Sequence, residues 1–404
     1  MNVSFITSKR PCIACGSAGF ARFYTNKYVA ELISGPSLVF DQSLECCYEC
    51  GLVRQEENKT YSAKNLSAYY KGIARTPVKP GAIAKNDKRS INARKRLDFI
   101  RKQKNKGTLL EIGFGDGVFL NEAAKHFTCT GLDPSKGYKY VNDYLASKGI
   151  KVYNTALENF DAKNKYDVVC CFLVLEHIQN PLAFLKQLKK HVKPGGLLVL
   201  EVPDIDRYKH FNSETMLTHE HVYHYTIKTL SHLLTVMDMK LVSYSNKNIS
   251  YGFSLLAAFA NGRPKSKTTL SGGFETLQVF EGFMDMRDSY RAKMQVALSD
   301  IVTKAQQRGQ KLAVYGTGFL FKFAQEKCGL KTNDVDYLFD DTPEKAGTAL
   351  DGKKILPLAE IAALNPGVVI VFSEMFFNLM KNNIEKHLPA GAADIVNIHQ
   401  KSQE

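Results

Sequence analysis

The sequence of 404 residues lacks any long apolar run. No uninterrupted apolar stretch approaches the roughly 18 residues that a membrane-spanning helix needs. The N-terminal stretch MNVSFITSKRPCIAC also lacks the basic region followed by an apolar region that is typical of an export signal. We therefore expect a cytoplasmic protein without a membrane partner.

Acidic residues are outnumbered by basic ones, and the imbalance is concentrated in one segment. The sequence has 54 Lys and Arg residues against 40 Asp and Glu residues, a net charge of +14. Residues 85–106 alone contain ten basic residues and only two acidic ones. Ile91, Leu97 and Ile100 would give this segment one apolar helical face, which favours a solvated surface helix. An anionic ligand or RNA is the alternative partner for these charges.

Aromatic residues are nearly absent from the same segment, where Phe99 is the single example. Proteins that bind single-stranded nucleic acid stack bases on aromatic side chains, so we do not expect a nucleic-acid partner. The apolar fraction of 44% and the charged fraction of 23% exclude intrinsic disorder. The length exceeds that at which one core usually stops growing and predicts two or three domains.

Cysteines are plentiful: the sequence has nine, and five of them lie in the first fifty residues. Cys12 and Cys15 form one CxxC pair, Cys47 and Cys50 form a second, and a glycine follows each pair. In a chain without an export signal, this pattern is typical of a structural Zn²⁺ site, because four thiolates fill the tetrahedral shell. Cys46 is an alternative ligand to Cys47.

Strand and helix patterns alternate twice along the chain. The first region, from Gly107 to about Val242, includes the strand-like runs GTLLEIGF and YDVVCCFLVL and the helix-like run PLAFLKQLKKHV. The second region starts at KLAVYGTGFLFKFAQEKCG, after a long helical segment that ends near Gly309. This alternation predicts an α/β fold with two Rossmann-like units. We expect a zinc-binding lobe at residues 1–65, a core at 66–245, and a second Rossmann-like domain with a helical connection at 246–404.

The stretch LLEIGFGDGVFL places Gly113, Gly115 and Gly117 between a predicted strand and a predicted helix. Glycines let a backbone turn tightly and approach a ligand closely. A dinucleotide site usually has its third glycine after two intervening residues, so the spacing found here favours a ligand without a phosphate. Glu111 precedes the turn, and Asp133 ends the next predicted strand, where a carboxylate can accept hydrogen bonds from ribose hydroxyls.

These motifs, in the order EIGFGDG, GLDPS, YDVVCCFLVLEHIQNP and VKPGGLLVLEVP, resemble the class I S-adenosylmethionine-dependent methyltransferases. The resemblance covers about residues 107–242. It implies that Glu111 and the three glycines border the methionine part of the donor. It also implies that Asp133 contacts the ribose, and that Leu157 and Glu158 flank the adenine.

The segments on either side of this core indicate a more specific family. Two CxxC pairs, a methyltransferase core and a terminal Rossmann-like unit are similar to bacterial C-methyltransferases that act on nucleotide-linked 4-keto-deoxysugars. In that family a signature close to YHEHLSYFS supplies a general base, and this chain has THEHVYHYT, in which Glu220 and His221 match while Thr218 replaces the leading Tyr. SAYYKG, with Tyr69 and Tyr70, corresponds to a Tyr-rich element that lines the acceptor site. The resemblance implies that the last domain faces the nucleotide-sugar.

Carbon methylation explains why a His–Glu pair would be placed here. A proton must leave the carbon next to a ketone, and an imidazole suits that task. We expect His221 to act as the base, Glu220 to fix its tautomer, and Tyr70 to complete the catalytic group. The sulfonium of the donor is already activated, so positioning and proton removal are the remaining work.

Several alternatives stay open from the sequence. Methylation of oxygen or nitrogen would leave His221 as a positioning or structural residue. His219, His221 and His224 could bind a metal, although the HExxH pattern fails at Tyr223. His177 could line the donor site or pack in the core. An RNA-modifying protein, or a ligand sensor that binds NAD or a nucleotide at the Gly316–Gly318 turn, would belong to other functional classes.

Overall fold

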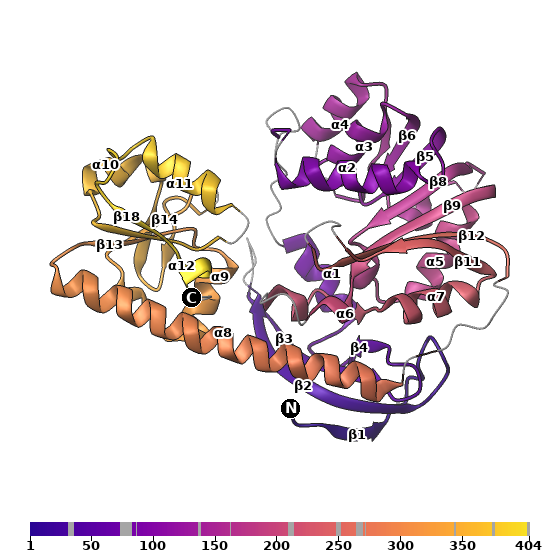
Figure 1. Ribbon diagram of the computed structural model, residues 1–404, viewed down its shortest axis with the longest axis horizontal. Coiled ribbons are helices and arrows are strands. Elements are labelled where there is room, and N and C mark those ends of the chain that lie inside the picture. The colour runs from indigo at the N-terminus through magenta and orange to yellow at the C-terminus, as the bar shows by residue number, and fades with distance from the viewer. Residues whose placement is uncertain are drawn as a thin grey trace. The chain divides into compact units, whose positions relative to one another are not determined.

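The computed structural model shown in Figure 1 describes most of the chain. The described residues are 1–30, 36–72, 83–85, 87–135, 139–161, 163–208, 214–247, 252–263, 270, 272–342, 345–373 and 376–401. They form two compact units, Met1–Met284 and Asp285–Glu404. Among these residues, no helix has both the length and the apolar character that a bilayer crossing requires.

The N-terminal residues form a five-stranded antiparallel sheet in the order β1-β2-β3-β4-β10. Its strands are β1 (Ser4–Thr7), β2 (Gly19–Ala30), β3 (Leu38–Cys47), β4 (Val53–Gln55) and β10 (Tyr223–His224). The last strand comes from a distant part of the sequence and pairs Tyr223 with Arg54. The candidate catalytic segment is therefore hydrogen-bonded to the cysteine-rich lobe.

The larger sheet of the first unit has seven strands in the order β11-β12-β9-β8-β5-β6-β7. These are β5 (Gly107–Ile112), β6 (Phe127–Leu132), β7 (Lys151–Tyr153), β8 (Tyr166–Phe172), β9 (Val192–Pro203), β11 (Met239–Ser245) and β12 (Ser254–Asn261). The strands from β5 to β9 are parallel, which confirms the predicted α/β class. β12 pairs antiparallel with β9, so this sheet continues past residue 245, where the sequence pattern placed the end of the core.

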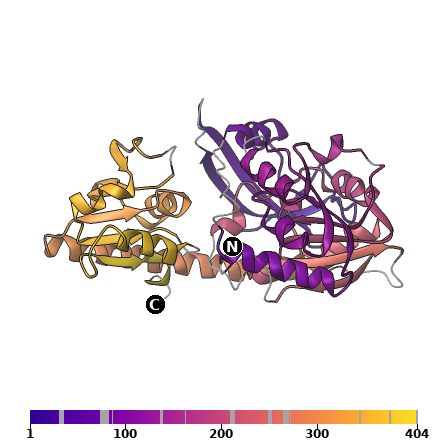
Figure 2. The same ribbon diagram turned by 90° about the horizontal axis from the view of Figure 1, so that it is seen from above.

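Both faces of this sheet are covered by helices, as Figures 1 and 2 show. On one face lie α2 (Lys88–Arg101), α3 (Val118–Ala123) and α4 (Lys139–Ser147), and on the other lie α5 (Pro181–Lys190) and α7 (Ile227–Thr235). Successive residues of a strand point to opposite faces, so Leu109 packs with the first set of helices and Leu110 with the second. This two-sided burial explains why the strands read as continuous apolar runs.

The basic segment forms the helix that was predicted. Leu97 and Ile100 of α2 are buried against the sheet, with 4% and 0% of their surface exposed, and Ile91 is partly buried. Two further helices, α1 (Ala63–Gly72) and α6 (Ile205–Tyr208), follow β4 and β9. The N-terminal sheet shares one hydrophobic cluster with the α5 and α7 face, and Phe20, Phe40 and Leu66 are among its members.

The second unit contains a second Rossmann-like sheet, in the order β15-β16-β14-β13-β17-β18. Its strands are β13 (Leu312–Tyr315), β14 (Tyr337–Phe339), β15 (Ala349–Leu350), β16 (Lys353–Leu356), β17 (Val368–Val371) and β18 (Asp394–Asn397). Its helices are α9 (Phe319–Cys328), α10 (Ile361–Leu364), α11 (Phe377–Glu385) and α12 (Ile398–Lys401). The long helix α8 (Gly273–Gln307), which the sequence predicts, contains the division between the units.

Candidate functional site

The glycine turn follows β5 at the carboxyl edge of the seven-stranded sheet. Gly113, Gly115 and Gly117 have φ angles of 76°, 53° and 73°. A Cβ would lie 2.6 Å from Val174 at Gly113 and 2.8 Å from Leu145 at Gly117, whereas at Gly115 it would meet no atom within 4 Å. All three backbone conformations thus favour glycine, Gly113 and Gly117 also leave no room for a Cβ, and Gly115 faces open space.

Two carboxylates lie beside this turn. Asp133 accepts hydrogen bonds from the backbone N–H of Gly115 at 3.0 Å and of Ser135 at 2.9 Å, so it holds the turn in place. Glu111 is 3% exposed, and its Oε2 has no hydrogen-bond partner among the described residues. Burial raises the pKa of Glu111 well above its ordinary value. A cationic group that approached Glu111 would restore its charged form.

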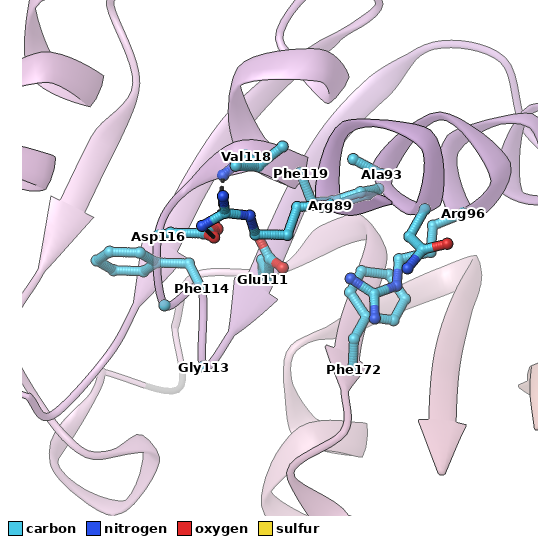
Figure 3. Close-up of a pocket in the computed structure, with 12 residues that line it drawn as sticks. Arg89, Ala93, Arg96, Glu111, Gly113, Phe114, Asp116, Val118, Phe119 and Phe172 are labelled. Atoms are coloured by element: carbon cyan, nitrogen blue, oxygen red, sulfur yellow. Dashed lines mark hydrogen bonds and ion pairs between the residues drawn. The ribbon is translucent and has the colours of Figure 1, made fainter. Parts of the chain in front are cut away.

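A cavity of about 220 Å³ lies between the turn and α2. It is lined by Arg89, Asn92, Ala93, Arg96, Glu111, Gly113, Phe114, Gly115, Asp116, Val118, Phe119 and Phe172. Figure 3 shows Arg89 reaching from α2 toward Asp116 on the turn, where the Nη1 to Oδ2 distance is 3.8 Å. The guanidinium of Arg96 lies 4.7 Å from the ring centre of Phe172 and is paired with Glu201.

Only some of the predicted donor residues line this cavity. Glu111, Gly113 and Gly115 do, whereas Gly117 and Asp133 do not. Leu157 and Glu158 are in the short 3₁₀ helix η2 (Leu157–Asn159) and do not line the cavity. Arg89 and Arg96 also line the cavity and were not among the predicted site residues, because the pattern of their segment indicates a solvated face.

The four cysteines of the two CxxC pairs converge in the N-terminal lobe. The Sγ atoms of Cys12 and Cys50 are 3.5 Å apart, as are those of Cys15 and Cys47, and all four lie within 4.8 Å of one another. Four sulfurs at about 2.3 Å from a Zn²⁺ would be separated by about 3.8 Å, so the arrangement fits that ion. Cys46 points away from the cluster toward the carbonyl of Gly273, at 3.6 Å, so Cys47 is the member that fits.

The two cysteine turns have the same local geometry. The N–H of Gly16 donates to the carbonyl of Cys12 at 2.8 Å, and the N–H of Gly51 donates to the carbonyl of Cys47 at 2.9 Å. Both glycines have positive φ angles, of 79° and 73°. Hydrogen bonds from the neighbouring thiols lower the pKa of Cys47. The lobe therefore presents a cluster in which at least one thiolate is already favoured.

The predicted catalytic residues come together beside the 3₁₀ helix η3 (Leu175–His177). The hydroxyl of Tyr69 donates to Glu220 at 2.8 Å, and the hydroxyl of Tyr70 lies 3.3 Å from Nδ1 of His177. The ring centres of His177 and His221 are 5.1 Å apart. His221, Glu220 and Tyr70, the residues predicted to be catalytic, therefore lie in one neighbourhood.

The expected role of Glu220 in fixing the tautomer is not what the structure shows. Nδ1 of His221 lies 3.2 Å from the carbonyl of Met216, which can only accept a hydrogen bond. The proton of the neutral imidazole is therefore on Nδ1, and the lone pair is on Nε2. Burial, together with His177 and His224, lowers the pKa of His221 well below its ordinary value, so the ring is neutral at pH 7.

The neighbouring histidines have other surroundings. His219 packs between aromatic rings, with ring-centre distances of 4.0 Å to Tyr28 and 4.8 Å to Phe40, and burial lowers its pKa to about 4. His224 lies 2.8 Å from the hydroxyl of Tyr208, and burial lowers its pKa to about 3. In the described part of the chain, neither belongs to a group with metal-ligand spacing, so the His219, His221 and His224 alternative is not supported.

The second Rossmann-like unit repeats both the turn and the carboxylate that supports it. Gly316 has a φ angle of 95°. Asp340, at the end of β14, accepts hydrogen bonds from the N–H of Thr317 at 2.9 Å and from its hydroxyl at 2.7 Å, and Lys345 pairs with it at 3.1 Å. Asp340 thus supports its own loop, as Asp133 does in the first unit, and is in addition paired with a lysine.

Two family models match the chain in separate segments. Residues 85–244 match a methyltransferase domain, and residues 267–398 match a C-methyltransferase C-terminal domain. The first segment contains the glycine turn and the residues around His221. The enzyme class predicted from the sequence, a S-adenosylmethionine-dependent methyltransferase, is confirmed for this domain.

Curated relatives match a shorter part of the chain. A ubiquinone biosynthesis O-methyltransferase of Rickettsia conorii is 31% identical over 96 residues, which are 23% of this chain and 33% of that protein. A tRNA U34 carboxymethyltransferase of Pseudoalteromonas atlantica is 34% identical over 101 residues, which are 23% of this chain and 31% of that protein. The chain thus spans about a third of the length of these relatives.

Among solved structures, the chain is similar to the N-methyltransferase NodS from Bradyrhizobium japonicum in complex with S-adenosyl-L-homocysteine. The sequence identity is 18%, the TM-score is 0.36, and the match covers 44% of this chain and 89% of that one.

Proposed function

We propose that this chain, whose residues 85–244 form a methyltransferase domain, transfers the methyl group of S-adenosylmethionine to a carbon beside the ketone of a nucleotide-linked keto-deoxysugar. The description of the second matched segment as part of a C-methyltransferase supports carbon as the methylated atom. The observation that carries the proposal is the position of His221: its Nδ1–H is bound to Met216, which leaves Nε2 as the proton acceptor, and its ring lies beside His177 in the cluster with Tyr70 and Glu220.

In the proposed reaction, Nε2 of His221 accepts the proton from the carbon next to the ketone. The electrons of the C–H bond form an enolate, whose carbon attacks the methyl group. The bond between sulfur and methyl breaks, and S-adenosylhomocysteine leaves. The hydroxyl of Tyr70, on α1, supplies a donor for the enolate oxygen. The hydroxyl of Tyr69 donates to Glu220, which orients that carboxylate within the acceptor site.

The donor would bind at the carboxyl edge of the seven-stranded sheet. The cavity beside Gly113 and Gly115 carries both signs of charge, which suits the amino-acid end of the donor: Arg89 would meet its carboxylate and Glu111 its ammonium. We propose Asp133 for the ribose and Leu157 with Glu158 for the adenine, as the family resemblance implies. The methyl group would then point toward His221.

The cysteine cluster would bind one structural Zn²⁺. The fit rests on four sulfurs within 4.8 Å of one another, with Cys12, Cys15, Cys47 and Cys50 as ligands. Four thiolates leave no open position on the ion, so its contribution would be stability and not catalysis. The lobe in turn holds the segment with His221 through the pairing of β4 with β10.

The test is hydrogen exchange in heavy water with a nucleotide-linked 4-keto-deoxysugar and no methyl donor. The wild-type enzyme should introduce deuterium at the carbon beside the ketone, because proton removal precedes methyl transfer. His221→Asn should reduce exchange by about 10²–10⁴ without changing the affinity for the donor. His126→Asn, the same substitution at an exposed turn, is the matched control.

The curated relatives include O-methyltransferases, which favours methylation of oxygen as the second candidate. That reaction predicts no deuterium at carbon and a milder effect of His221→Asn. Methylation without exchange would therefore replace the carbon proposal with the oxygen one.

A further inference from the structure

Three acceptor atoms converge beside η3, outside the cysteine cluster. Among the described residues, Glu176, His177 and His221 form the second group with metal-ligand spacing, with one ligand atom from each within 4.8 Å of the others. Glu176 is 2% exposed and His221 is 8% exposed. No proposed step of methyl transfer uses Glu176.

Each imidazole keeps one ring nitrogen whose lone pair could bind a metal ion. Nδ1 of His221 donates to the carbonyl of Met216, and Nδ1 of His177 donates to the carbonyl of Glu220 at 3.0 Å. Since a neutral imidazole has a single N–H, Nε2 of each ring is an acceptor. Nε2 of His177 lies 3.9 Å from Oε1 of Glu176, which is too far for a hydrogen bond.

The carboxylate of Glu176 supplies the third acceptor atom from a buried position. Its Oε2 has no hydrogen-bond partner in the part of the chain that the structure describes. A buried carboxylate that faces imidazole lone pairs is electrostatically unfavourable unless a cation or a proton joins them.

The backbone holds these three side chains in place. The N–H of Val222 donates to the carbonyl of Glu176 at 2.7 Å, and the N–H of His221 donates to the carbonyl of Thr218 at 3.1 Å. The segment with His221 is thus joined directly to η3, which carries both other groups. Such a frame is the prearranged support that metal ligands require.

We propose that Glu176, His177 and His221 form a second metal site, which binds a divalent transition-metal ion through one carboxylate oxygen and two imidazole nitrogens. Two imidazoles and one carboxylate suit Zn²⁺, Co²⁺ and Fe²⁺. Ligands at about 2.0–2.2 Å from one ion are about 3.0–3.5 Å apart. Binding would therefore have to bring the ligand atoms closer together, from 3.9 Å for His177 and Glu176 and from no more than 4.8 Å for the other pairs.

The consequence for activity rests on the proposed function. An ion on Nε2 of His221 occupies the lone pair that would accept the proton from the substrate. The metal-bound form is therefore inactive in methyl transfer, and the second site makes the enzyme sensitive to transition metals. Structural zinc in the cysteine cluster does not interfere, because its ligands are separate.

The probe is Co²⁺, added to the full-length protein after its cysteine cluster has been loaded with Zn²⁺. Calorimetry should show saturable binding of one ion. The visible spectrum should show the weak bands of cobalt with nitrogen and oxygen ligands, without the strong sulfur-to-cobalt band that replacement of zinc would give. Glu176→Gln and His221→Asn should each weaken binding by more than about 100-fold, beyond the 10–100-fold typical of outer-shell changes. His126→Asn should bind Co²⁺ like the wild type.

Co²⁺ should also abolish methyl transfer and deuterium exchange at stoichiometric occupancy, and a chelator should restore both. The metal site would be overturned if Co²⁺ showed no saturable binding, or if Glu176→Gln bound it as the wild type does. A proton shared by the three residues would then explain their arrangement. Stimulation by Co²⁺ would overturn its inhibitory effect. Metal binding is measured without substrate. The binding result can therefore be interpreted even if the proposed function is wrong.

Discussion

Buried polar atoms without hydrogen-bond partners are concentrated around residues 218–226 and η3. Among the described residues they include both ring nitrogens of His219, Nε2 of His224, the hydroxyl of Tyr225 and Oε2 of Glu176. Each such atom costs free energy of folding, of the order of 1–3 kcal/mol. Proteins retain such unsatisfied atoms mainly where a ligand or a reaction needs them.

His219 allows this cost to be measured at a residue with no proposed part in the reaction. We predict that His219→Phe stabilises the protein by about 1 kcal/mol, because an apolar ring suits the contacts with Tyr28 and Phe40 and removes two unsatisfied nitrogens. For a unit of this size the melting temperature should rise by about 2–4 °C at pH 7.5.

The same variant should change the acid sensitivity of the protein. The pKa of His219 is lowered from 6.5 to about 4 in the folded state, so the unfolded chain binds the proton first. The neutral His219 therefore imposes no pH-dependent loss of folding free energy above pH 6.5. As the pH falls from 6.5 toward 4, the folded state is progressively destabilised relative to the unfolded state. The advantage of His219→Phe should therefore grow over that range. An advantage that stays constant from pH 7.5 to pH 4.5 would contradict the shift.

Asp133 has two roles that one substitution would test together. Asp133→Ala should weaken binding of S-adenosylmethionine by more than about tenfold, because it removes the proposed ribose acceptor and the support of Gly115. Calorimetry with the donor measures the effect. Asp143→Ala, at an exposed carboxylate of α4 paired with Lys139, is the control and should bind normally. Unchanged affinity in Asp133→Ala would place the donor elsewhere.

At the scale of elements, the two cysteine turns make a prediction about neighbouring residues. Cys47→Ser should lower bound zinc to less than about half an equivalent, whereas Cys46→Ser should retain about one, because Cys46 faces Gly273 and not the other cysteines. Metal analysis of the undenatured proteins gives both values. Loss of zinc from the Cys46 variant would reverse the assignment.

The elements that local patterns specify were predicted correctly from the sequence. Buried parallel strands, the apolar face of α2, the glycine turn and the CxxC turns each depend on residues close together in the chain. The pairing of β10 with β4 could not be predicted, because two residues carry no strand pattern and their partner is about 170 positions away. β12 lies outside the range predicted for the core, because it pairs antiparallel with β11 and β9 and so departs from the alternating pattern of parallel strands and helices.

Site residues that belong to a sequence motif could be predicted. Site residues that only the fold brings to the site could not. Arg89 and Arg96 belong to a segment whose many charges conceal two that face a cavity. Glu176 precedes His177 in the sequence, but only the structure shows it buried next to His221. The hydrogen bond from His221 to the carbonyl of Met216 depends on backbone geometry, so no side chain in the sequence could indicate it.

At the scale of the whole molecule, each unit has its own hydrophobic core. We predict two calorimetric transitions, because separate cores unfold separately when little couples them. A zinc chelator should shift only the transition of the first unit, since Cys12, Cys15, Cys47 and Cys50 all lie there. A single transition, or an equal shift of two, would show that the units unfold together.

The short pairing of β10 with β4 also limits how this protein can change during evolution. Some side chains in residues 218–226 differ from the signature that the segment resembles, as Thr218 and His224 illustrate. The number of residues cannot change, because Tyr223 must stay opposite Arg54 while the N–H of Val222 reaches Glu176. One inserted residue after His221 would shift the register and turn His224 to the opposite face of the strand. We therefore expect evolution to change amino acids in this segment but to keep its length.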